Sequence, residues 1–335
     1  MIAISDSLSM SSLPLRKLLV DTDPGGDDAI ALLWLQSLVR QGLAELVAVT
    51  TAQGNVNGSR TFTSACQLLQ LGGCAGVEVA RAVADPPGIL PDARHIHGAD
   101  GMGDLSATLP ASRRDWQTAP SADDTIIDAL TQSPGEITVV GLAPLSNLAA
   151  AEAKRPGILK LAKEVVLMLG AFERQGNMTP LAEFNAAYDP QAAQSVLESG
   201  ANLVVLPLDV TQELIFRRQT AREMRSRAPE SAIAVFVDRL CEFMTETALR
   251  YRETAGIDGF LVHDAVTVAY LFYPETLKFR RAEVRIETEG RYSAGYTFID
   301  RRHGAKLQAN AFVGCEVNRQ QLLAILRDDL QQLIA

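Results

Sequence analysis

Short apolar runs alternate with longer segments of helical periodicity along the first two thirds of the chain. The apolar runs predict strands at residues 17–23, 44–55, 136–147, 163–172 and 201–210. The helical segments between them cover residues 27–40, 59–73, 148–155 and 189–200. The strand runs are continuous stretches of Val and Leu, which is typical of strands buried on both faces of a parallel sheet. This alternation predicts an α/β fold with a doubly wound, mostly parallel sheet flanked by helices.

The pattern changes after Thr211. Helices are expected at residues 236–252 and 263–273, strand-like segments at 278–287, 296–300 and 310–317, and a closing helix at 318–334. No linker rich in Pro, Ser or Gly and no internal repeat divides the chain. We therefore expect one domain over residues 17–335, with the C-terminal helices covering the sheet, preceded by a flexible extension at residues 1–16.

Composition and charge restrict the possible functions. The 335 residues are 47% hydrophobic and 21% charged, as in a soluble globular protein with a large core. The net charge of -9, without a Lys/Arg cluster, disfavours nucleic acid or an anionic membrane as a partner. No apolar run reaches the roughly 18 residues of a membrane span, and no signal-peptide pattern opens the chain. Because the four cysteines form no CxxC pair, we expect reduced thiols and a cytoplasmic protein.

Four aspartates crowd into the segment "DTDPGGDD" after the first strand, namely Asp21, Asp23, Asp27 and Asp28. Pro24 favours an extended Asp23, and the two glycines allow a tight turn back toward the strand end. Asp27 and Asp28 then lie at a helix start, where free N–H groups favour anions. Because carboxylates this close together still repel one another, we expect a bound cation to compensate their charge. Hard oxygen ligands without paired Cys or His favour Ca²⁺ or Mg²⁺ over zinc.

The other expected strands are also followed by residues suited to a site. In an open α/β sheet, ligands bind beyond the carboxyl ends of the strands. The side chains that follow these ends are therefore expected to face one crevice, and they belong to Asn55, Asn147, Met168, Asn177, Glu183, Asn185, His263 and Asp264.

Other interpretations of the aspartate segment fit less well. An EF-hand loop needs a glutamate at its twelfth position, which is Leu32 when counted from Asp21. A haloacid-dehalogenase-type phosphatase would have Thr or Val where this chain has Gly25. A solvated turn with a helix cap explains one aspartate but not four between two buried apolar runs.

The segment "DTDPGGDDAIAL" resembles the N-terminal signature of the inosine-uridine preferring nucleoside hydrolase family. The resemblance continues in the same order through "VTTAQGN", "HGADGMG", "VVGLAPLSNLA", "AEFNAAYDPQAA" and "HDAV", over residues 18–272. Members of this family cleave the N-glycosidic bond of ribonucleosides with water, using a bound Ca²⁺. The resemblance implies a nucleoside-hydrolase-like fold, Ca²⁺ as cofactor, a small-molecule ribonucleoside as partner, and a homodimer or homotetramer.

Carried onto this chain, the resemblance implies a metal site, a base and an acid. The metal ligands would be the carboxylates of Asp23, Asp28 and Asp264 and the main-chain carbonyl of Leu142. Asp23 would also deprotonate the attacking water. His263 would be the acid for the leaving nucleobase, since histidine titrates near neutral pH.

The resemblance also implies contacts with the substrate. Asp27 and Asn185 would hydrogen-bond the ribose diol, and Asn177 and Glu183 would hold the 5′ side of the ribose. Residues expected to line the sugar and base pocket are Asn55, His97, Met168 and Phe184. His95 is expected to be an ordinary polar residue.

Two alternatives to this hydrolase remain at the level of sequence. One is a haloacid-dehalogenase-type phosphohydrolase, and the other is a catalytically inactive nucleoside- or sugar-binding protein of the same fold. The presence of both Asp23 and His263 favours the enzyme. Segment 251–261 should shape the base pocket, with Tyr251 and Phe260 as candidate contacts. It matches no specificity subtype, so the expected nucleobase is either a purine or a pyrimidine.

Overall fold

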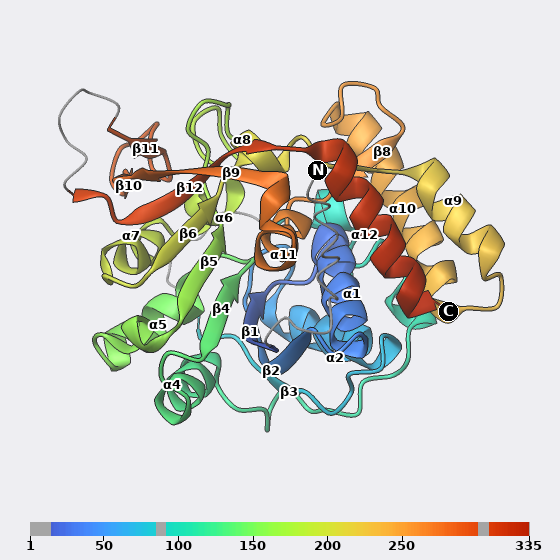
Figure 1. Cartoon of the computed structure of the whole chain (residues 1–335), viewed down its shortest axis with the longest axis horizontal. Helices are drawn as coiled ribbons and strands as arrows, with labels where there is room; N and C mark the ends of the chain where they lie inside the picture. The colour runs from blue at the N-terminus through green and yellow to red at the C-terminus, as the bar shows by residue number, and fades with distance from the viewer. Residues whose placement is uncertain (1–14, 85–91, 301–307, 335) are drawn as a thin grey trace, which may run out of the picture.

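The computed structural model describes residues 15–84, 92–300 and 308–334 and contains one eight-stranded sheet flanked by helices (Figure 1). The strands lie side by side in the order β3 (Glu78–Ala80), β2 (Ala44–Thr51), β1 (Arg16–Thr22), β4 (Ile137–Gly141), β5 (Glu164–Met168), β6 (Leu203–Leu206), β12 (Ala311–Val317) and β9 (Leu277–Ala282). Neighbouring strands are parallel except for β12 with β9. The expected doubly wound, mostly parallel fold is confirmed. Of the expected N-terminal extension, residues 1–14 lie outside the described residues.

Strand β1 shows why the apolar runs of the sequence are continuous. Leu18 and Val20 contribute to the core on one face of the sheet, and Leu19 contributes to the core on the other. The first face is covered by α1 (Gly26–Arg40), α2 (Gly58–Leu71), α11 (Ala265–Phe272) and α12 (Arg319–Ile334). The second face is covered by α4 (Ala122–Gln132), α5 (Ser146–Lys154) and α7 (Pro190–Glu198). Figure 1 shows the two groups of helices on opposite sides of the sheet.

The direction of winding reverses between β1 and β4. From β1 the chain runs outward through α1 to β2 and through α2 to β3, and it returns by way of α4 to β4 on the other side of β1. Both neighbours pair with β1 in parallel, so that Leu18 lies opposite Leu46 on one side and Thr138 on the other. Ligands of open α/β sheets bind beyond the carboxyl ends of the strands at such a reversal.

The elements that the sequence predicts for the last third of the chain are present, and one of them is divided. Helices α10 (Ala232–Tyr251), α11 and α12 confirm the three expected helices. The strand expected at residues 278–287 divides at Glu283, because β9 pairs with β12 whereas β10 (Val284–Ile286) pairs with β11 (Thr297–Ile299). Helices α11 and α12 pack on α1 and so cover the sheet as expected.

Smaller elements complete the described part of the chain. Helix α10 packs against α9 (Arg218–Arg227) and against β8 (Gly259–Leu261), and β8 pairs antiparallel with β7 (Ile215–Arg217). The short helices near the sheet edge are α3 (Arg94–His97), α6 (Phe184–Tyr188) and α8 (Leu208–Thr211). None of the described helices has both the length and the apolar character needed to cross a membrane. The four cysteines are unpaired in the structure.

Candidate active site

The carboxyl ends of β1, β4 and β5 open into one cavity. The expected metal ligands, catalytic residues and sugar contacts all line it, and of the residues singled out for the substrate only the candidate base contact Tyr251 does not: the lining includes Asp23, Asp27, Asp28, Asn55, His97, Leu142, Met168, Asn177, Glu183, Phe184, Asn185, His263 and Asp264. Asn147 instead lies behind the cavity, where its side-chain Nδ2 donates to Asp21 Oδ1 at 2.7 Å. The structure thus brings the expected site residues together, and their roles stay predictions.

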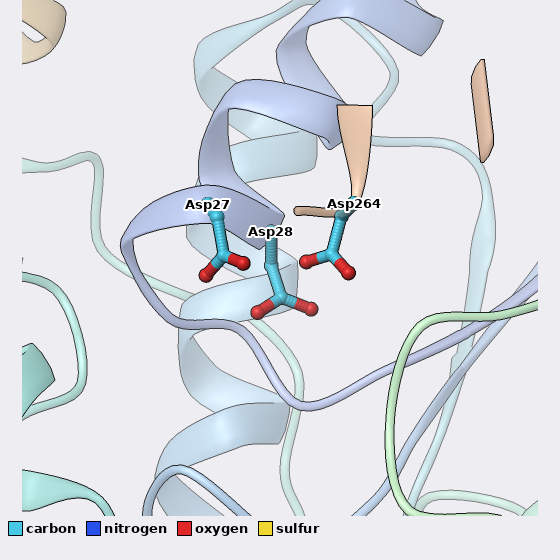
Figure 2. A group of neighbouring side chains, drawn as sticks. All are labelled: Asp27, Asp28 and Asp264. Atoms are coloured by element: carbon cyan, nitrogen blue, oxygen red, sulfur yellow. The ribbon is translucent and has the colours of Figure 1, made fainter. Parts of the chain in front are cut away.

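Three carboxylates meet at the centre of the cavity. Asp27, Asp28 and Asp264 each offer an oxygen, and these oxygens lie within 4.8 Å of one another (Figure 2). Figure 2 shows Asp27 and Asp28 leaving the first turn of α1 and Asp264 facing them from the segment before α11. The carboxylate ligands expected from the resemblance are Asp23, Asp28 and Asp264. The three carboxylates that lie closest together therefore share Asp28 and Asp264 with the expected set and include Asp27 in place of Asp23.

Asp23 lies beside this group and is connected to it by Asn55. The backbone N–H of Asn55 donates to Asp23 Oδ2 at 2.7 Å, and its side-chain Nδ2 lies 3.3 Å from Asp28 Oδ2. Asp28 also accepts the hydroxyl of Thr22 at 2.5 Å and the N–H of Gly25 at 2.9 Å. The expected general base and the acidic group therefore share one polar network.

Burial raises the pKa of each aspartate at this centre, and repulsion between the carboxylates raises it further for Asp23, Asp27 and Asp264. Burial, followed by the charge of Asp28, raises the pKa of Asp27 to about 8 and the pKa of Asp23 well above its usual range. The same two causes raise the pKa of Asp264. No Lys or Arg occurs among the described residues that line the cavity. This set of buried, uncompensated oxygen donors fits a hard divalent cation such as Ca²⁺ or Mg²⁺.

Asn185 ties together the ends of two central strands. Its side-chain Nδ2 donates to the main-chain carbonyl of Leu142 at 2.8 Å and to that of Met168 at 3.0 Å. Leu142 follows β4, and Met168 is the last residue of β5. The amide therefore fixes the carbonyl of Leu142, an expected metal ligand, at the rim of the cavity.

In the loop expected at the 5′ side of the ribose, the polar side chains accept hydrogen bonds from backbone N–H groups. Glu183 caps α6, where its carboxylate accepts the N–H of Asn185 at 2.7 Å, and it also accepts the N–H of Gly170 at 2.9 Å. Asn177 Oδ1 accepts the N–H of Phe184 at 2.8 Å. These bonds hold both polar side chains at the cavity before any substrate arrives.

Two imidazoles line the cavity with their Nδ1 atoms already engaged. His97 Nδ1 accepts the N–H of Gly26 at 3.0 Å, and His263 Nδ1 lies 2.8 Å from the hydroxyl oxygen of Thr211. Burial lowers the pKa of His97 to about 3 and the pKa of His263 to about 4. Both rings are therefore neutral at pH 7, which departs from the expectation that His263 titrates near neutral pH.

Several residues of the cavity were not expected from the sequence. His95 lines it, contrary to the expectation of an ordinary polar residue, and its position two residues before His97 was the available signal. Phe260 lines the cavity as expected, whereas Tyr251 lies outside the lining and meets the His95 ring edge-on at 5.4 Å. Glu253 and Leu261 also line the cavity and belong to segment 251–261, which was expected to shape the base pocket. The other additions carry no motif, and they are Asp92, Ala93, Ile96, Met178 and Met244.

Comparison with known proteins gives consistent matches over almost the whole chain. The family model described as inosine-uridine preferring nucleoside hydrolase matches residues 18–324. The chain is 31% identical to the inosine-uridine preferring nucleoside hydrolase of Leishmania major, over 95% of this chain and 98% of the relative. It is 34% identical to the pyrimidine-specific ribonucleoside hydrolase RihA of Shewanella woodyi, over 94% and 98% of the two chains.

A solved structure extends the similarity to three dimensions. The purine-preferring ribonucleoside hydrolase from Gardnerella vaginalis matches the fold with a TM-score of 0.85. The two sequences are 26% identical, and the match covers 95% of this chain and 99% of that one. The similarity therefore includes the elements that carry the cavity.

Proposed function

The chain belongs to the inosine-uridine preferring nucleoside hydrolase family, and from that premise we propose that it hydrolyses ribonucleosides with the help of Ca²⁺. The bond that breaks is the N-glycosidic bond, and the products are ribose and a free nucleobase. The observation that carries the proposal is the meeting of Asp27, Asp28 and Asp264, with Asp23 beside them, in a cavity whose described lining contains no Lys or Arg.

The cation would be held by oxygen atoms alone. Asp23, Asp28 and Asp264 would offer carboxylates, and Leu142 would offer its main-chain carbonyl. That carbonyl accepts a hydrogen bond from Asn185, and its second lone pair is available for an ion. When bound, Ca²⁺ would take up the vicinal ribose hydroxyls and lower the pKa of the attacking water.

Asp23 is the proposed general base. Burial and the neighbouring Asp28 raise the pKa of its carboxyl, and a raised pKa strengthens a carboxylate as a proton acceptor. Asp23 would take one proton from the water while the oxygen of the water attacks C1′. Asp27 and Asn185 would hydrogen-bond the ribose hydroxyls and hold C1′ in line with that water.

Positive charge develops on the sugar as the bond from C1′ to nitrogen breaks. The aspartates of the cavity and Glu183 would stabilise this oxocarbenium-like state by electrostatic attraction. The bonding electron pair leaves with the nucleobase, on the side that His263 is proposed to face. The hydroxyl group of the water bonds to C1′ and its proton passes to Asp23, and in the net reaction one proton ends on the departing nucleobase. The reaction therefore needs no reactant besides water.

The nucleobase and the setting are part of the proposal. Because one relative is named pyrimidine-specific and one solved structure purine-preferring, the assay has to include both kinds of nucleoside. We place the reaction in nucleoside salvage in the cytoplasm and expect a homodimer or homotetramer. A haloacid-dehalogenase-type phosphohydrolase disagrees with the family match, which leaves an inactive nucleoside-binding protein as the alternative.

A reducing-sugar assay on inosine, guanosine, uridine and cytidine, with Ca²⁺ and after chelation, tests the proposal. We expect ribose release that stops on chelation and returns with Ca²⁺. The Asp23→Ala variant should lose on the order of 10²–10⁴-fold in kcat, the usual contribution of a general base, with an unchanged circular dichroism spectrum. Near-normal turnover by this variant would exclude Asp23 as the base. Nucleoside binding by the wild type without ribose release would identify the inactive alternative.

A further inference from the structure

The buried hydroxyl of Thr211 contacts His263, the histidine proposed to assist departure of the nucleobase. Thr211 is the last residue of α8, has no solvent exposure, and places its Oγ1 2.8 Å from His263 Nδ1. It does not line the cavity in which we propose that the substrate binds. Any influence on the reaction must therefore pass through the imidazole of His263.

The direction of this hydrogen bond follows from the surroundings of Thr211. A buried hydroxyl proton without an acceptor is costly, and among the described residues His263 Nδ1 is the partner that this hydroxyl has. Thr211 therefore donates and Nδ1 accepts. In a neutral imidazole whose Nδ1 is an acceptor, the proton resides on Nε2. His263 then presents an Nε2–H donor, the form that can hydrogen-bond a departing base.

His97 provides an internal comparison. Its Nδ1 accepts a backbone N–H, that of Gly26, and a backbone amide can only donate. Its neutral ring must therefore carry the proton on Nε2. Two different donors, one a main-chain amide and one a hydroxyl, thus set the same tautomer in His97 and His263.

The turn that carries Thr211 is rigidly attached to its surroundings. The N–H of Leu208 donates to the carbonyl of Gly170, and the carboxylate of Asp209 accepts the N–H of Phe172. Just after the turn, the N–H of Val262 donates to the carbonyl of Leu214, which holds the residue before His263 against the exit of α8. Hydrogen bonds to backbone groups before and after Thr211 therefore hold the turn, and with it the hydroxyl, in place.

We propose that Thr211 is a positioning residue that fixes the Nε2–H tautomer and the ring orientation of His263 for departure of the nucleobase. The inference rests on the proposed function, because it assigns a partner to the histidine of that reaction. Its consequence is selective: losing the hydroxyl should impair substrates whose leaving group needs a hydrogen bond and should spare those whose leaving group does not.

Leaving-group dependence tests the consequence. Thr211→Val keeps the shape and removes the hydroxyl. We expect kcat for the best nucleoside to fall by about 10–100-fold, which is less than the roughly 10²–10⁴-fold contribution of a group that acts directly on the reacting proton. Hydrolysis of 4-nitrophenyl riboside, whose leaving group needs no proton, should change by less than about 3-fold. His263→Ala should show the same selectivity with a larger loss. Thr211→Ser should restore most of the nucleoside activity.

A matched control separates positioning from folding. Thr276 is also buried, and its hydroxyl donates to the carbonyl of Tyr273 at 2.7 Å, at the end of α11 away from His263. Thr276→Val should therefore cost comparable stability without leaving-group selectivity. Equal losses on both substrates in Thr211→Val, or no loss on either, would overturn the proposal.

The tautomer can be observed without any turnover. With four histidines in the chain, ¹⁵N-labelled imidazoles can be assigned by substitution, and long-range ¹H–¹⁵N spectra report which nitrogen is protonated. We expect an Nε2–H form for His97 and His263 in the Ca²⁺-treated wild type, and a mixed His263 form in Thr211→Val. Protonation of His263 on Nδ1 in the wild type would refute the proposal. If no substrate is hydrolysed, the proposed function fails, while this spectrum still decides on Thr211.

Discussion

At the residue scale, the loop that holds Asn55 depends on the absence of a side chain at Gly54. A Cβ built on Gly54 would overlap Asp23 Oδ2 and lie 2.9 Å from Asp23 Cγ. Asp23 Oδ2 is the atom that accepts the N–H of Asn55. Glycine at this position therefore lets the loop after β2 approach the proposed base closely enough to hydrogen-bond it.

We predict that Gly54→Ala displaces the carboxylate of Asp23 and lowers kcat by about 10²-fold, because a shift of about 1 Å in a reacting group has an effect of that size. Steady-state kinetics with the best nucleoside measures this loss. Gly76→Ala is the control, since nothing lies within 4 Å of a Cβ at Gly76. Wild-type kcat in Gly54→Ala would show that the loop relaxes around Asp23.

At the scale of elements, α1 carries the proposed metal site at one end and anchors the C-terminal helix along its length. Asp329 of α12 accepts Trp34 Nε1–H at 2.7 Å and the hydroxyl of Tyr273 at 2.6 Å. Its main-chain carbonyl accepts the hydroxyl of Ser37 at 2.5 Å. Helix α12 is thus locked to α1 and to the end of α11, the two helices that present the acidic group.

We predict that Asp329→Ala lowers the free energy of unfolding by about 2–4 kcal/mol, because it leaves the donors of Trp34 and Tyr273 without their acceptor. Urea unfolding followed by fluorescence measures the change. Asp328→Ala is the control on the same helix, since the Asp328 side chain is 63% exposed in its pair with Arg327, and a change within about 0.5 kcal/mol is expected there. Equal effects of the two substitutions would argue against the network.

At the scale of the whole molecule, the buried carboxylates make stability depend on pH. Burial raises the pKa of Asp21 to about 7, and burial with the charge of Asp28 raises the pKa of Asp27 to about 8. A carboxyl with a raised pKa in the folded state binds its proton more tightly there than in the unfolded chain. The free energy of unfolding of the metal-free protein should therefore fall as the pH rises from about 4 to about 8.

We predict that the Tm of the chelated protein falls by about 5 °C or more between pH 5 and pH 8. Added Ca²⁺ should raise the Tm, and raise it more at pH 8, because the ion binds the ionised carboxylates of the folded state. Differential scanning calorimetry with and without Ca²⁺ measures both effects. A Tm that rises with pH in the chelated protein, or that ignores Ca²⁺, would contradict this account of the acidic cluster.

Prediction of elements from sequence succeeded where the local signal was strong. The Val/Leu runs of β1, β4 and β5 and the long periodic helices α1, α10 and α12 are confirmed. Strand β3 has only three residues, too few to produce a pattern. Helix α9 buries only Ala221 and Met224 among its described residues, so its periodicity is weak.

The sequence by itself determined the α/β alternation, the polar residues that follow the ends of the strands and the oxygen-rich chemistry of the proposed ion. These follow from the spacing of neighbouring residues and from side-chain type. Only the tertiary structure decided that Asp27 joins Asp28 and Asp264, and that Thr211 engages His263. Such contacts join segments far apart in the chain, and their atoms are placed by strand register and helix packing, which no local pattern encodes.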